Sequence, residues 1–173
     1  ALALKGISMI AENLEKAYEN GEDREARRNM MIASTIGGMA FISSNVGAVH
    51  AFAETVGAWF DTPHGVANSL FLPYIMEFNI PACPERFADI ADAMGIEREE
   101  SMSDEQYALK AVEYVKALNR KLNIPTIKEI KGITEERFEA IAERSANNVL
   151  SNDNARKITK EDYLELLKKA YNE

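Results

Sequence analysis

His50 and His64 are the only histidines in the 173-residue chain, and they stand fourteen positions apart. Residues 48–60 are predicted to form a helix and residues 61–65 a turn, so the two imidazoles can converge on one point across the helix and the turn. Neutral imidazole is a common ligand of first-row divalent metal ions. A shared metal site is therefore one interpretation of the pair.

The two histidines can also be ordinary core or surface residues without a metal. On spacing alone this interpretation is stronger, because two histidines in a chain of this length are more often of that kind. Two ligands are also fewer than the three or four protein ligands of a tight mononuclear site. Any metal bound by His50 and His64 would need further ligands from elsewhere.

Glu54 lies one helical turn after His50, so its carboxylate is expected on the same helix face. It could act as a third metal ligand, as a proton-relay group or as a group that orients His50. An ordinary solvated glutamate is an equally good interpretation. Asp61 precedes the turn, where aspartate is favoured for bonding local backbone, so we interpret it as a turn residue rather than a catalyst.

The elements that must position these residues are predicted to be helical throughout. Apolar residues recur at steps of three and four, and no convincing strand or repeat is present in the sequence. Pro73 falls inside one predicted helix and predicts a kink or a restart there. The predicted helices are residues 2–19, a segment running from 23 through 36, then 48–60, 66–78 and 87–94, followed by three more carrying 107–122, 138–149 and 163–171, the last opened by a Thr159-x-x-Asp162 capping pattern.

The helical periodicity predicts one all-α, multi-helix bundle domain over residues 1–173, with roughly seven to nine helices. A chain of this length can bury one sizeable core. The first residues already show helical spacing without a capping residue in front, so we expect the chain to begin inside a helix of a longer protein.

The net charge of −8 gives no support for binding nucleic acid or an anionic membrane, and a small-molecule or protein partner is favoured instead. The longest apolar runs are short and interrupted, so no membrane span is expected. The single cysteine, Cys83, has no adjacent base and cannot form an intramolecular bridge, which fits a reducing compartment. Cytoplasm is the simplest localisation.

A longer pattern surrounds the histidines. Residues 47–79 read GAVHAFAETVGAWFDTPHGVANSLFLPYIMEFN, with glycines, prolines and both histidines at characteristic spacings. This stretch closely resembles the signature of the iron-containing (group III) alcohol dehydrogenase family. Residues 33–45 and the later Asn154-Ala-Arg156 motif are similar to family features too, so the resemblance covers essentially the whole chain.

The resemblance implies a two-domain parent protein, with an N-terminal nucleotide-binding α/β domain and a C-terminal helical domain that face each other across the active site. It also implies a metal held by one aspartate and three histidines. His50 and His64 look like the last two of these ligands. The Asp-x-x-x-His pair that would supply the others does not occur in the sequence and is expected before Ala1, in an N-terminal domain that is absent here.

The implied activity is hydride transfer between NAD or NADP and an alcohol or aldehyde. The expected metal is Fe(II), with zinc as the alternative, and the nicotinamide would be bound mainly by the absent domain. The resemblance further implies a homo-oligomer in the full-length protein. This chain alone is expected to be inactive, because it offers two metal ligands and no dinucleotide site.

Two departures from the family pattern and two rival functions stay open. Glu54 stands where many members carry a second histidine, which leaves open its expected catalytic role as a proton relay, and Ala155 replaces the proline of an Asn-Pro-Arg motif.

One rival function is that of a zinc-dependent relative, such as a glycerol dehydrogenase or dehydroquinate synthase, although the PHGVAN string at residues 63–68 favours the alcohol dehydrogenases. The other rival is a helical interaction module without chemistry.

Overall fold

The computed structural model describes residues 1–42 and 44–173. In this part of the chain there are eight α-helices, four short 3-10 helices and no strand, so the predicted all-α fold is confirmed. The chain forms two compact units, one made of residues 1–45 and 83–111 and the other of residues 46–82 and 112–173. None of the described helices is both long and apolar enough to span a bilayer. Residue 43, in the segment 33–45 that is similar to family features, lies outside the described residues.

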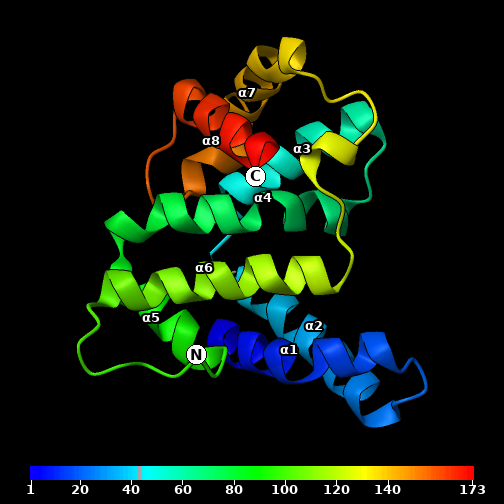
Figure 1. Ribbon diagram of the computed structural model, residues 1–173, viewed down its shortest axis with the longest axis vertical. Helices are drawn as coiled ribbons and strands as arrows, with labels where there is room; N and C mark the ends of the chain where they lie inside the picture. Colours follow the sequence, from blue (N-terminus) through cyan, green and yellow to red (C-terminus); the bar gives the residue numbers. More distant parts are fainter. Residues whose placement is uncertain (43) are drawn as a thin grey trace. The chain divides into compact units, whose positions relative to one another are not determined.

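The first unit is built on a helical hairpin of α1 (Leu2–Glu19) and α2 (Arg24–Phe41), which lie side by side in Figure 1. Asp23 caps α2 by accepting bonds from the backbone N–H groups of its first turn. Between the helices, Asn29 Nδ2 donates to Asn13 Oδ1 at 3.0 Å. The third helix, α5 (Pro84–Ala93), packs on α1 and begins three residues earlier than predicted, because Pro84 is preorganised for the first helical position.

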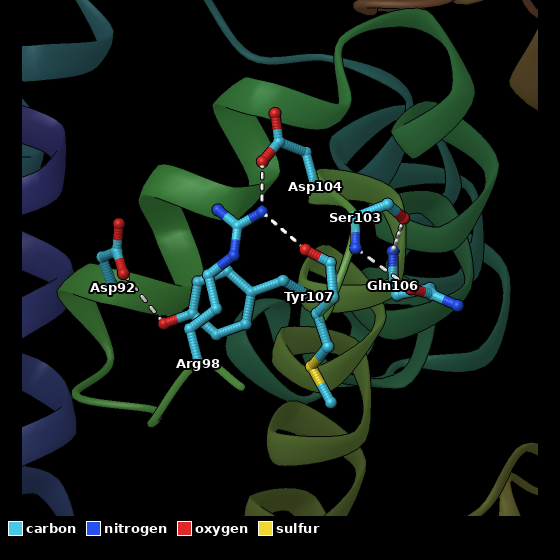
Figure 2. A network of polar contacts seen from close by, with 7 residues as sticks. Asp92, Arg98, Ser103, Asp104, Gln106 and Tyr107 are labelled. Atoms are coloured by element: carbon cyan, nitrogen blue, oxygen red, sulfur yellow. Dashed lines mark hydrogen bonds and ion pairs between the residues drawn. The ribbon is translucent and has the colours of Figure 1, made fainter. Parts of the chain in front are cut away.

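A polar network in the same unit ties the loop after α5 to the start of α6 (Asp104–Lys121), as Figure 2 shows. The fully buried Tyr107 donates its hydroxyl to Asp92 Oδ1 at 2.9 Å. Arg98 donates to Asp104 Oδ1 at 2.7 Å and lies with its guanidinium 5.1 Å from the Tyr107 ring centroid. Burial, together with the bond to Asp92, raises the pKa of the Tyr107 hydroxyl, which therefore stays a neutral donor.

The second unit contains both histidines and a continuous apolar core. In this core the Phe52 ring stacks on Phe71 with centroids 4.1 Å apart and meets Tyr163 edge-on at 4.7 Å. Such aromatic pairs add about 0.5–1.5 kcal/mol each beyond the area they bury. Its principal helices are α3 (Ala48–Phe60), α4 (His64–Asn79), α7 (Phe138–Ala146) and α8 (Lys160–Asn172), which Figure 1 labels.

Helix α3 is the centre of this unit, since it contacts α4, α7 and the 3-10 helix η4 (Val149–Asp153). Its residues Ala51, Phe52 and Val56 are fully buried, as the helical spacing of the segment predicts. The predicted capping box at Thr159 and Asp162 is confirmed at the start of α8. Three further 3-10 helices were not predicted: η1 (Ile80–Ala82), η2 (Ile127–Glu129) and η3 (Glu135–Arg137).

Helix α4 runs through Pro73 without a restart, so of the two predicted outcomes, a kink or a restart, the restart is wrong. Proline has no backbone N–H, so the carbonyl four residues earlier, that of Ser69, loses its helical donor. The side chain of Asn119 on α6 donates to this carbonyl at 2.7 Å. The replacement donor explains how a proline is accommodated in an unbroken helix.

Candidate metal centre

The two imidazoles lie beside each other in the second unit. His50 is in the first turn of α3, and His64 is the first residue of α4 rather than part of the turn as predicted. Asp61 ends α3 in the left-handed conformation with φ 50°, in keeping with its interpretation as a turn residue. The reversal brings the ring centroids of His50 and His64 to 5.2 Å, with the planes inclined by 51°.

The pair fits a divalent metal ion in spacing and in protonation. Metal–nitrogen bonds of about 2.0–2.1 Å at tetrahedral angles place the centroids of two imidazoles roughly 5 Å apart. Burial lowers the pKa of His50, and the neighbouring His64 lowers it further, while Glu54 opposes both. A lowered pKa keeps the ring neutral at physiological pH, and neutral imidazole is the form that binds metal.

Asn68 lies beside His64. It belongs to the PHGVAN string, but its place next to the imidazole was not predicted from the sequence. It lies one turn after His64 on α4, where its Nδ2 is 3.1 Å from His64 Nε2 and donates to the His64 carbonyl at 2.9 Å. Its Oδ1 is buried and has no hydrogen-bond partner in the structure. An amide four residues after a histidine on a helix is the signal that identifies it.

Glu54 shares the α3 face with His50 and is exposed. Its Oε2 accepts a bond of 2.7 Å from Asn148 Nδ2, which reaches the site from the start of η4. Among the described residues no three histidine, cysteine, aspartate or glutamate side chains are close enough to hold a metal ion. Glu54 therefore does not complete a three-ligand site with His50 and His64, and its third-ligand interpretation has no support. No local sequence pattern could have indicated Asn148, which is 94 positions away from its partner.

Comparison with known proteins decides the family. Residues 1–171 match the Fe-containing alcohol dehydrogenase family, C-terminal. The chain belongs to this family. The resemblance noted in the sequence is thereby confirmed, and the all-α fold is that of the family's C-terminal domain.

Two relatives from other organisms match nearly the whole chain. Alcohol dehydrogenase 4 of Saccharomyces cerevisiae is 38% identical over 174 residues, which is 99% of this chain and 44% of the yeast protein. The 1,3-propanediol dehydrogenase of Citrobacter freundii is 37% identical over 171 residues, again 99% of this chain and 44% of the relative. The chain thus spans less than half the length of the relatives it matches.

Solved structures of the family have the same fold. A crystal structure of 1,3-propanediol oxidoreductase superposes with a TM-score of 0.94 at 36% identity, over 98% of this chain and 44% of that one. An alcohol dehydrogenase from Oenococcus oeni gives a TM-score of 0.92 at 38% identity, over 97% of this chain and 44% of its own. In both cases the similarity covers one part of a larger protein.

Proposed function

We propose that this domain is the metal-binding part of an NAD- or NADP-linked alcohol dehydrogenase acting on small alcohols and aldehydes. The observation that carries the proposal is the pair of imidazoles, His50 and His64, placed 5.2 Å apart at the junction of α3 and α4. Family membership and the names of the relatives support the reaction class.

His50 and His64 would supply two of the ligands of a divalent metal ion, Fe(II) in first place and zinc as the alternative. Both rings are suited to either ion, and zinc has at least the same intrinsic affinity for nitrogen ligands. When bound, the ion would act as a Lewis acid toward the oxygen of the alcohol or aldehyde. The remaining protein ligands would come from outside this chain.

Glu54 is proposed to act as a catalytic proton relay. Its carboxylate is exposed and lies one helical turn from His50, while the amide of Asn148 holds one of its oxygens. A carboxylate in this position can pass a proton between the substrate oxygen and solvent. Asn68, next to His64, would fix the orientation of that ring.

The nicotinamide is proposed to bind mainly to an N-terminal nucleotide-binding domain that is not in this chain. In support, the chain corresponds to 44% of the length of its relatives. Hydride transfer would then require both parts, and the chain alone should show no alcohol-dependent reduction of NAD or NADP. The complete protein is expected to form a homo-oligomer.

The proposal is tested by metal analysis of the longer parent protein. His50→Ala and His64→Ala should each remove most of the bound metal, because each takes away one of the few protein ligands that hold the ion. Met31→Ala is a control, since that side chain is 75% exposed on α2. Metal content is measured by mass spectrometry and folding by circular dichroism. Folded histidine variants that keep the parent's metal content would overturn the metal site and favour a helical module without chemistry.

A further inference from the structure

Helix α3 begins without a capping side chain of its own. The residue before its first turn is Gly47, which has no side chain to accept a bond from the exposed N–H groups of that turn. The acceptor comes instead from 106 positions further along the chain, where Asn154 Oδ1 accepts from the Ala48 backbone N–H at 3.3 Å. A remote asparagine thus has the role that a local N-cap residue usually has.

Asn154 is itself fixed by an amide pair with Asn79, the last residue of α4. Asn154 Nδ2 donates to Asn79 Oδ1 at 2.7 Å, and Asn79 Nδ2 donates to Asn154 Oδ1 at 3.1 Å. The second N–H of Asn154 is directed to the Arg156 carbonyl at 2.7 Å. Asn79 is only 7% exposed, so its amide must be satisfied within the protein. Through this pair, the first N–H of the helix that carries His50 is tied to the end of the helix that carries His64.

A side chain at position 47 would crowd this contact. A Cβ atom built on Gly47 would lie 3.0 Å from Asn154 Oδ1 and 3.3 Å from its Cα. The second of these is a backbone atom, so the 154 segment would have to shift away from α3 by a few tenths of an ångström. The absence of a side chain at position 47 therefore allows the remote cap to approach.

Arg156 supports the same segment from the α4 side. Its guanidinium donates to the Phe78 carbonyl at 3.0 Å and lies 4.2 Å from the centroid of the Phe78 ring. Asn154 and Arg156 thus hold adjacent residues at the end of α4, and of the hydrogen bonds described for their side chains only that of Asn154 reaches α3. Comparing the two residues therefore distinguishes an effect of capping α3 from an effect of anchoring residues 154–156 to α4.

We propose that Asn154 is a positioning residue for the metal centre, which caps α3 from outside and fixes His50 relative to His64. The proposal rests on the proposed function, because it assumes that these two histidines bind the metal. Residues that orient metal ligands typically change affinity by about 10–100-fold when they are removed. Asn154 would act in this way through the backbone of α3 instead of through the imidazole itself.

The test compares Asn154→Ala with Arg156→Ala in the longer parent protein. Co(II) affinity is measured by competition with a chelator, and the visible spectrum of bound Co(II) reports the coordination geometry. Hydrogen exchange of residues 46–52 in the metal-free protein reports the cap directly. We expect Asn154→Ala to weaken Co(II) binding about tenfold or more, to shift the spectrum and to speed exchange, and Arg156→Ala to leave affinity within about twofold.

Asn154→Asp tests the acceptor by itself. Its carboxylate can still accept from the Ala48 N–H and suits a helix N-terminus, but it cannot make the bonds that Asn154 Nδ2 donates to Asn79 Oδ1 and to the Arg156 carbonyl. It should slow exchange of residues 46–52 relative to Asn154→Ala and restore only part of the Co(II) affinity. If Asn154→Ala does not fold, Gly47→Ala takes its place in the same assays with the same expected losses. Equal effects of Asn154→Ala and Arg156→Ala on affinity, or unchanged exchange in Asn154→Ala, would overturn the positioning role. Absence of Co(II) binding in the unaltered parent would refute the proposed function and with it the metal-positioning role, while the exchange data would still decide whether Asn154 caps α3.

Discussion

Asn119 donates its side-chain N–H to the Ser69 carbonyl at 2.7 Å, in place of the backbone N–H that Pro73 lacks. The bond joins α6 to the middle of α4 within the second unit. Since α4 begins with His64, the integrity of this helix bears on the metal centre as well as on stability.

Replacing Asn119 by alanine should destabilise the protein by about 1–3 kcal/mol, because the Ser69 carbonyl would lose this side-chain donor in a partly buried position. Equilibrium urea unfolding measures the loss. In a Pro73→Ala background a backbone N–H becomes available to Ser69, so the same substitution should cost much less. Equal losses in both backgrounds would show that the bond does not compensate for the proline.

The parts of the fold that the sequence predicted are those encoded by local periodicity. The helix at residues 48–60 was predicted with its observed bounds, because its apolar spacing is ended by a turn that contains Asp61. Contacts between distant positions could not be predicted in this way. Asn119 and Ser69 are 50 positions apart, and Glu54 and Asn148 are 94 apart, so no pattern along the chain marks either pair.

The same distinction applies to the candidate site. The fourteen-residue spacing of His50 and His64 passes through one helix and one turn, which is why residue types alone could bring the two rings together. The amide of Asn154 at the start of α3 depends on the packing of segments 106 positions apart. The division of the chain into two compact units was not predicted either, since no linker-like composition marks its boundaries.

Tyr163 should make stability fall at high pH. Burial raises the pKa of this hydroxyl to about 12, although its hydrogen bond with Ser151 acts in the other direction. The folded state therefore favours the neutral phenol; the resulting stability is fully present below the ordinary tyrosine pKa of about 10 and is lost as the pH rises toward 12. A shift of two units corresponds to roughly 2–3 kcal/mol.

Tyr163→Phe removes this titration. Between about pH 9 and pH 12 the unfolding free energy of the parent should therefore fall by roughly 2–3 kcal/mol more than that of the variant. Urea unfolding at each pH measures it, and absorbance of the tyrosinate follows the ionisation. Tyr18→Phe, at a side chain that is 52% exposed, is the matched control and should leave the pH profile unchanged. Parallel profiles for the parent and Tyr163→Phe would contradict the raised pKa.

Glu54→Gln separates a proton relay from a metal ligand. The glutamine can still accept the bond from Asn148 through its amide oxygen, so the local geometry is kept while the titratable group is removed. In the longer parent protein we expect kcat to fall by about 10²-fold or more at unchanged metal content, as the loss of a general acid–base group does. Loss of metal in the folded variant would instead identify Glu54 as a ligand, and unchanged kcat with unchanged metal would mean that it is an ordinary surface residue.

Asn68→Ala should weaken metal binding without unfolding the helix. The variant loses the contact of 3.1 Å between the amide and His64 Nε2, which restricts the orientation of the imidazole. It also removes a buried oxygen that has no hydrogen-bond partner among the described residues. Affinity for Co(II) in the parent protein should drop about 10–100-fold. Ser69→Ala is the matched control: Ser69 is the next residue on α4, and its hydroxyl makes a similar bond of 2.8 Å to a carbonyl four residues earlier, that of Gly65 instead of His64. Equal losses of affinity in the two variants would show that the effect comes from α4 as a whole and not from the amide beside His64.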